Sequence, residues 1–314
     1  MKKIKEYFIT TIILLAGLLL IELTIRIINS DMENYDLEMW KYAIELKQRD
    51  PVIGHIHKSN KKAILQNVEI KLNSLGMRSE EPDPLRKKIL FIGSSISLGW
   101  GVKKESTYVG IFENEIETNN LNYQVLNGSV GNYNTFRYVE NFLHNQKSLN
   151  PDIIVINYFI NDAEILPMGS NNWLLKNSAL AASLNIAFKR ITARSGNNLK
   201  EYYNSLYDPK AEGFKNMYNS LRKLSEYSLQ HKIKIYFVII PDIHFLENYP
   251  FSPIHQKMGK LATKLNFEVI DLYSALEGIP FDKLQITPGD SHPNSYGHKL
   301  MSKKLINEIL PDLK

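Results

Sequence analysis

Short apolar runs alternate with longer amphipathic stretches from residue 87 to the C-terminus. Several of the short runs are apolar at every position, which is typical of parallel strands buried between two layers of helices. The stretches between them repeat apolar residues every three to four positions, as in helices with one buried face. The predicted strands are Lys88–Ile92, Tyr123–Leu126, Ile153–Tyr158, Ile233–Ile240 and Phe267–Ile270, and the predicted helices include Thr107–Thr118, Thr135–His144, Gly213–Gln230, Pro253–Leu265 and Ser295–Ile309. The pattern predicts an α/β fold: a three-layer α/β/α sandwich around a mainly parallel five-stranded sheet.

The amino terminus carries a different pattern. Phe8–Ile21 is almost wholly apolar, and Glu22 and Arg26 beyond it are spaced to pair on a helix. Lysines precede this segment and acidic residues follow it, which predicts a cytoplasmic amino terminus with the remainder outside. We therefore expect residues 1–30 to be a single-pass transmembrane signal anchor in the cell membrane, with the rest of the chain extracytoplasmic; a cleaved signal peptide is the alternative.

Two further regions interrupt the α/β pattern. Residues 31–86 are polar and irregular, with a helix-like piece at Leu37–Gln48 and an alternating, strand-like piece at Gln66–Asn73. We interpret them as a membrane-proximal arm that packs on the main domain of residues 87–314. Residues 163–212 have no strand signal but include a helix-like piece, Trp173–Arg194, and are predicted to be a helical lid insertion.

The first predicted core strand ends in Gly93, Ser94 and Ser95. Open α/β sheets place their chemistry beyond the carboxyl ends of parallel strands, so a serine at this point is a candidate nucleophile.

A general base for that serine is predicted on a loop before the last helix. Asp290 and His292 are two residues apart, so on an extended loop both side chains can point the same way. The carboxylate would then fix the imidazole tautomer and leave Nε2 free to take a proton. The alternative is a surface loop in which both residues merely cap the helix.

Two loops could supply donors to a developing oxyanion. The loop at residues 127–135 contains glycines, which allow backbone N–H groups to approach a ligand. The loop at residues 157–162 carries Asn161, whose side-chain amide is a donor. Ordinary β-to-α turns favour the same residue types, so each loop alone is weak evidence.

The composition excludes or disfavours several other functions. The chain has no cysteine, which excludes disulfides and a thiolate nucleophile. Part of its formal charge of +5 lies in lysines ahead of the apolar segment, and no basic stretch interleaved with aromatic residues suggests nucleic acid as a partner. His55 and His57 could bind a metal, but no third ligand is near in sequence, and a strand surface is the simpler interpretation.

Taken together, the four loops resemble the four sequence blocks of the SGNH/GDSL hydrolases over about Lys87 to Leu310. The resemblance implies a flavodoxin-like fold and an acyl-enzyme mechanism without a metal or organic cofactor. It assigns the nucleophile to Ser95, the base to His292 and the orienting acid to Asp290. The oxyanion donors would be Asn161 and the backbone of Gly131 or Asn132.

The sequence departs from the family at two positions. Ser94 stands where the family has aspartate, which makes Ser94 a rival nucleophile, although the spacing to Gly93 and Gly99 favours Ser95. Asn132 aligns with a family glycine, and asparagine is among the few other residues that visit positive φ. An α/β-hydrolase fits less well, because the G-x-S-x-G pattern is incomplete.

We therefore expect a membrane-anchored, extracytoplasmic serine esterase. By family analogy, its ester substrate is an acylated carbohydrate, such as an O-acetylated polysaccharide. Two alternatives stay open: an O-acetyltransferase that uses the same triad, and a non-catalytic polysaccharide-binding or assembly protein.

Overall fold

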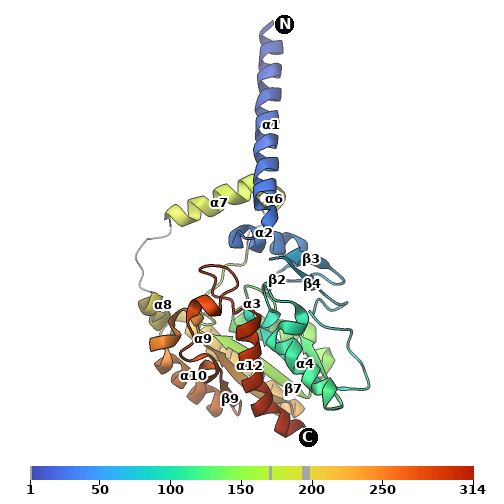
Figure 1. Ribbon diagram of the computed structural model, residues 1–314, viewed down its shortest axis with the longest axis vertical. Coiled ribbons are helices and arrows are strands. Elements are labelled where there is room, and N and C mark those ends of the chain that lie inside the picture. Colours follow the sequence, from blue (N-terminus) through green and yellow to red (C-terminus); the bar gives the residue numbers. More distant parts are fainter. Residues whose placement is uncertain (1, 170–171, 193–198) are drawn as a thin grey trace.

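The structure, a computed structural model, describes residues 2–169, 172–192 and 199–314. Its centre is a sheet of five parallel strands in the order β6-β5-β7-β8-β9 (Figure 1). The strands are β5 (Lys87–Gly93), β6 (Tyr123–Asn127), β7 (Ile153–Phe159), β8 (Lys234–Ile240) and β9 (Glu268–Asp271). All five predicted strands are present within one or two residues of their expected bounds, and the predicted fold class is confirmed.

Helices cover both faces of this sheet. Helices α4 (Tyr108–Thr118) and α12 (Ser295–Ile309) pack together on one face, and α5 (Thr135–Asn141) and α9 (Glu212–His231) pack together on the other. Helix α10 (Ser252–Lys264) packs against β8 and β9. Strand β7 is buried at all seven positions, because helices cover it on each side.

The strand order reverses beside β5. The chain runs from β5 to its neighbour β6 and then crosses back to β7 on the other side of β5. The loops that leave β5, β6 and β7 therefore diverge at one edge of the sheet. This switch point is where doubly wound sheets bind ligands.

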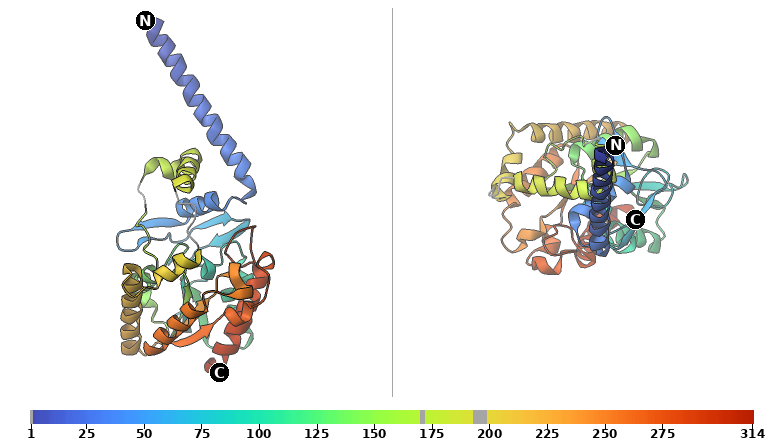
Figure 2. Two further views of the ribbon diagram at one scale, coloured as in Figure 1. Left: turned by 90° about the vertical axis from the view of Figure 1, so that its left-hand side faces the viewer. Right: turned by 90° about the horizontal axis from the view of Figure 1, so that it is seen from above.

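Helix α1 (Lys2–Ile28) projects from the folded head (Figures 1 and 2). At about 1.5 Å per residue its length is about 40 Å, which exceeds the ~30 Å hydrocarbon core of a bilayer. Its apolar side chains are exposed around the helix. Within the described residues it is the one helix long and apolar enough to cross a membrane.

The region after α1 consists of helix α2 (Tyr35–Glu45) and two antiparallel hairpins. Strands β1 (Lys47–Asp50) and β2 (Gly54–His57) form the first hairpin, and β3 (Lys62–Leu65) and β4 (Val68–Lys71) form the second. A small apolar core joins α2 and the second hairpin to Leu98 and Trp100 of the main domain. The alternation at Gln66–Asn73 correctly indicated β4, but a strand that begins at residue 66 was wrong. Gln66 and Asn67 have positive φ angles and form the turn of the hairpin.

The predicted helix Trp173–Arg194 is broken in the structure, and its last two residues lie outside the described part of the chain. Helix α6 (Trp173–Asn177) ends at Ser178, which is extended, and α7 (Ala179–Thr192) starts again in a new direction. The cause is Glu22 of α1. Its carboxylate accepts hydrogen bonds from the backbone N–H groups of Ala179 and Leu180, and a negative charge at a helix N-terminus is stabilising.

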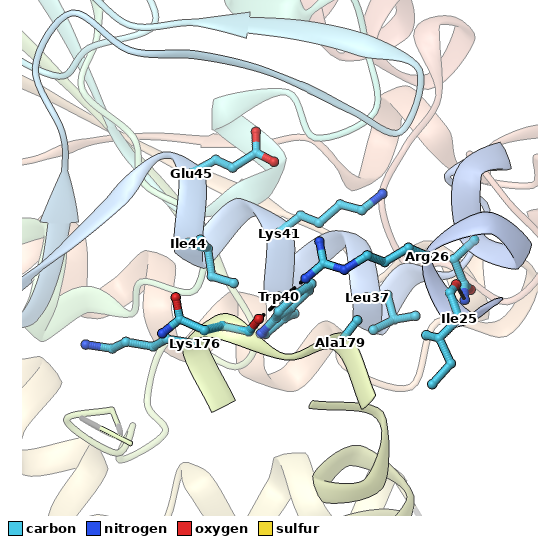
Figure 3. Close-up of a pocket in the computed structure, with 11 residues that line it drawn as sticks. Ile25, Arg26, Leu37, Trp40, Lys41, Ile44, Glu45, Lys176 and Ala179 are labelled. Carbon is cyan, nitrogen blue, oxygen red and sulfur yellow. Dashed lines mark hydrogen bonds between the residues drawn. The ribbon is translucent and has the colours of Figure 1, made fainter. Parts of the chain in front are cut away.

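The same junction ties α1 to α2. Glu22 pairs with Arg26 at 2.7 Å, as the sequence spacing predicts, and the Arg26 guanidinium lies over the ring of Trp40 (Figure 3). The Trp40 indole N–H donates to the carbonyl of Leu175, just before the break. Helices α1, α2, α6 and α7 therefore meet at one point, with a cavity of about 320 Å³ between them. The lid role of residues 163–212 stays a prediction.

Acid should destabilise the fold through His298, which is buried between α12 and α4. Its Nδ1 accepts the N–H of Tyr108, and burial lowers the pKa of His298 from 6.5 to about 3. Between these two values the unfolded chain binds a proton that the folded chain does not, so the free energy of unfolding falls as the pH drops. We expect His298→Asn, which keeps an acceptor, to show a shallower fall in urea midpoint between pH 7 and pH 4.5 than the wild type.

The matched control is His231→Asn, which removes an exposed histidine from the end of α9. This variant should keep the wild-type pH dependence. Identical slopes for the wild type and His298→Asn would contradict the prediction.

Candidate active site

A cavity of about 130 Å³ lies at the switch point. The main domain contributes Ser94, Ser95, Asn132, Asn161 and His292 to its wall, so the four loops singled out in the sequence meet here. The remaining lining residues are Tyr35, Met39, Ile96, Tyr133, Asn134, Phe159, Glu164, Leu166 and Ser291.

Ser95, His292 and Asp290 form one hydrogen-bonded line. Ser95 Oγ lies 2.7 Å from His292 Nε2, and His292 Nδ1 lies 2.6 Å from Asp290 Oδ1. The carboxylate fixes the tautomer in which Nδ1 carries the proton, so Nε2 accepts from the serine hydroxyl. The same Asp290 oxygen also accepts the backbone N–H of His292, which holds acid and base in register. This is the arrangement of a nucleophile, a base and an orienting acid.

Local sequence explains how the serine is presented. Gly93 ends β5, and a side chain there would collide with Ser97 and Asn157, so only glycine allows the turn. Ser94 is extended, and Ser95 opens the short helix α3 (Ser95–Leu98). Both serines line the cavity, but the imidazole meets Ser95, the residue favoured by the spacing.

The base is enclosed by aromatic rings. Tyr35 lies 5.9 Å from the His292 ring between centroids, and Trp100 lies 6.5 Å from it. His292 is 5% exposed, so bulk water reaches little of it. Asn294 caps α12 by accepting from the N–H groups of Tyr296 and Gly297, which fixes the end of the loop that carries the base.

Two of the three predicted oxyanion residues line the cavity, and the third does not. Asn132 has a φ of 62°, the left-handed conformation that asparagine tolerates. Asn161 lines the same wall as the nucleophile. Gly131 differs from the expectation, because its N–H donates to the hydroxyl of Tyr42 at 2.7 Å and is not directed at a substrate. The backbone alternatives therefore reduce to Asn132.

The region before residue 87 holds this loop in place. The Gly131 carbonyl accepts from Lys47 Nζ at 2.7 Å and lies 3.1 Å from His55 Nε2. Tyr42 also contacts His57 Nε2 at 2.6 Å, and His57 Nδ1 bonds to the carbonyl of Gly76. Thus both histidines considered as metal ligands make hydrogen bonds that organise the loop.

Sequence reasoning missed the contribution of α2 to the cavity. Tyr35, Met39 and Tyr42 of α2 and its C-cap residue Leu46 recur at helical spacing, and this stripe was the available signal. It predicts one buried face, but it does not tell which surface covers that face. In the structure the stripe meets the base, the cavity and the Gly131 loop.

Burial also shifts two carboxyl groups near Asn161. It raises the pKa of Asp162 well above its usual value, and Asp162 is 1% exposed beneath the loop. Burial likewise raises the pKa of Glu164, which lines the cavity and accepts a hydrogen bond from Tyr202. Asp162 therefore lies beneath the Asn161 loop, and Glu164 forms part of the cavity wall. Among the described residues, neither carboxyl group is a hydrogen-bond partner of the Ser95 hydroxyl.

Another Asp-x-His pair, Asp242 and His244, repeats the local geometry of the triad pair. His244 Nδ1 lies 2.6 Å from Asp242 Oδ1, and the Asp242 carboxylate raises the pKa of His244. His244 packs on Phe281 and faces a separate cavity. The motif alone therefore does not single out a candidate base; what distinguishes His292 is its contact with Ser95.

Comparison with known families identifies the class of protein. Residues 91–300 match the GDSL-like Lipase/Acylhydrolase family, which is two thirds of the chain. The chain belongs to this family, and the resemblance seen in the sequence is confirmed. The match begins after the arm, so Tyr35, Tyr42 and Lys47 lie outside it.

Several solved structures resemble the chain at low sequence identity. The crystal structure of TesA is 14% identical with a TM-score of 0.48, and covers 72% of this chain and 99% of its own. Axe2, an acetylxylan esterase from Geobacillus stearothermophilus, is 17% identical (TM-score 0.48; 72% and 96% covered). The esterase EstA from Pseudoalteromonas sp. is 16% identical (TM-score 0.44; 72% and 98% covered). A search of curated proteins found no match.

Removal of the Tyr42 hydroxyl should impair turnover. Tyr42→Phe leaves the Gly131 N–H and His57 buried without their partner, at a cost of about 1–3 kcal/mol for each group. The loop should relax, and kcat for p-nitrophenyl acetate should fall roughly tenfold or more with little change in KM.

Tyr236→Phe is the control, because it removes a buried hydroxyl that bonds to Asp312 near the C-terminus. It should lower stability without changing kcat. A folded Tyr42→Phe protein with wild-type kcat would show that the contact is structural only.

Proposed function

We propose that the protein is a membrane-anchored serine esterase that removes short acyl groups, such as O-acetyl groups, from a carbohydrate outside the cytoplasm. The observation that carries the proposal is the line from Ser95 Oγ through His292 to Asp290, at 2.7 and 2.6 Å. A line of this kind activates a hydroxyl for acyl transfer. Its completeness argues against a non-catalytic binding protein.

In the proposed reaction Ser95 Oγ attacks the ester carbonyl carbon while His292 Nε2 takes the hydroxyl proton. The oxyanion accepts hydrogen bonds from the Asn132 N–H, the Asn161 amide and the Ser95 N–H. His292 then gives its proton to the departing alcohol, leaving an acyl-Ser95 ester. Water repeats the sequence, releases the acid and restores the serine. Asp290 keeps the imidazole oriented throughout.

The size of the cavity supports a short acyl group. Its volume of about 130 Å³ is close to the ~150 Å³ cavity that holds a single benzene ring. An acetyl group fits such a space. A carbohydrate as the alcohol part rests on the family resemblance.

The nucleophile is tested by covalent labelling. Ser95→Ala should abolish reaction with a fluorophosphonate probe, because the probe needs the activated hydroxyl, and should reduce ester hydrolysis by about 10⁴-fold or more. Ser94→Ala is the matched control and should still label. Undiminished labelling of Ser95→Ala would move the nucleophile elsewhere.

Analysis of the reaction products distinguishes hydrolysis from transfer. Acetate released from acetylated xylo-oligosaccharide or p-nitrophenyl acetate identifies a hydrolase. Acetyl transfer to an added oligosaccharide, with little free acetate, would identify a transferase with the same residues.

For the membrane part, we propose that α1 is a signal anchor with its amino end in the cytoplasm. Lys2, Lys3 and Lys5 precede the apolar segment, and acidic residues follow it. In intact cells or spheroplasts, protease added from outside should degrade residues after about 31 and leave an amino-terminal tag intact. Digestion of the tag alone would contradict the orientation.

A further inference from the structure

A second, larger cavity adjoins the candidate active site. Its volume is about 740 Å³, and Asn132, which carries the proposed oxyanion N–H, lines both spaces. It lies between the end of α2, the first hairpin, and residues 167–169 and 172–177. An ester held at Ser95 can therefore extend past Asn132 into this space, which we name the cationic groove.

The charge of the groove is one-sided. Among the described residues, its lining includes five cationic side chains and no aspartate or glutamate: Lys47, Arg49, Lys58, Arg137 and Lys176. Asp50, the nearest acid on the same hairpin, accepts the N–H groups of Val52 and Ile53. A cavity lined by charges of one sign concentrates ligands of the opposite sign.

Two of these cations are held close to Asn132 by neutral partners. Arg137 is 2% exposed and donates to the main-chain carbonyls of Asn132 and Pro167. Lys47 is partly buried and donates to the carbonyl of Gly131. Burial of a cation without an anion is costly, so the site is arranged to gain from an anionic ligand.

The electrostatic environment agrees with this geometry. Burial lowers the pKa of Lys47 well below its usual value, and the charge of Arg137 lowers it further. Burial and the charge of Lys47 also lower the pKa of His55 to about 2. Lys47 and Arg137 repel one another, and an anion bound beside them would relieve that repulsion.

The two cavities divide a substrate into parts. The small cavity at Ser95 has room for a short acyl group. The groove is much larger, and its lining combines cationic groups with the apolar side chains of Trp40, Met168 and Leu175. A glycan that carries anionic groups would place them against these cations and its sugar rings against Trp40.

We propose that the substrate is an O-acylated glycan that carries carboxylate or phosphate groups, and that the cationic groove binds an anionic group close to the ester. This inference rests on the proposed esterase function and adds the substrate class. Arg49, Lys58 and Arg137 would contribute most to specificity, through contacts that a neutral glycan cannot make.

The test compares kcat/KM for O-acetylated oligogalacturonate and acetylated xylo-oligosaccharide of similar length, with the full-length protein in detergent. We expect the anionic substrate to be preferred at least about tenfold at low salt, and the preference to shrink as NaCl rises from about 0.05 to about 0.5 M, since salt screens charges. De-acetylated oligogalacturonate or inorganic phosphate should inhibit competitively, and the stronger inhibitor identifies the preferred anion.

Charge reversal at the rim sharpens the test. Arg49 is exposed on β1, so Arg49→Glu should fold, and it should lower the ratio of anionic to neutral kcat/KM by about fivefold or more. Lys58→Gln provides a second, uncharged change. Lys303→Glu, an equal charge change on an exposed position of α12, should leave the ratio unaltered.

Several results would overturn the inference. They are a ratio at or below one in the wild type, no inhibition by either anion, no response to Arg49→Glu and Lys58→Gln, or preferential cleavage of a lysophospholipid. Hydrolysis of p-nitrophenyl acetate distinguishes failure of the proposed esterase function from failure of the proposed substrate class. If this neutral ester is not cleaved, the proposed esterase function fails; if it is cleaved without anionic preference, only the substrate class fails.

Discussion

The candidate active site depends on how the backbone at Gly131 and Asn132 is held. Three of its four polar groups are bound by side chains: the Gly131 N–H by Tyr42, the Gly131 carbonyl by Lys47 and the Asn132 carbonyl by Arg137. The fourth, the Asn132 N–H, is the proposed oxyanion donor. Since backbone groups are strong hydrogen-bonding partners, fixing three of them fixes the direction of the fourth. Two of the three restraints come from outside the family-matched region, so the arm is part of the site.

The sequence was sufficient to predict the sheet and the Asp290–His292 contact because both are governed by local patterns. Apolar runs identified β5 to β9, and the two-residue spacing of Asp290 and His292 predicted a contact that the structure contains. The spacing does not predict which pair meets the serine, because Asp242 and His244 have the same spacing and the same mutual geometry, whereas the contact with Ser95 is made by His292. Proximity to Ser95 is a property of the folded topology, which brings positions 95 and 292 together.

The predictions that were wrong share a physical cause in contacts between distant segments. Trp173–Arg194 has the composition of one helix, yet Glu22 accepts N–H groups at Ala179 and Leu180 and stabilises a new start there. No local pattern near residue 178 predicts that carboxylate. In the same way, Gly131 was a reasonable donor on its own loop, and only the packing of α2 directs its N–H to Tyr42. Such contacts decide the details of a site whose outline the chain specifies locally.

The short connection between α1 and α2 has a mechanical consequence. Helix α1 ends at Ile28, and Tyr35, whose ring lies against the base His292, is seven residues later. Seven residues reach at most about 25 Å even when fully extended. With α1 in a bilayer, as proposed, this short connection would keep the proposed base His292 close to the lipid surface. The proposed activity would then be confined to substrate that comes close to the membrane surface.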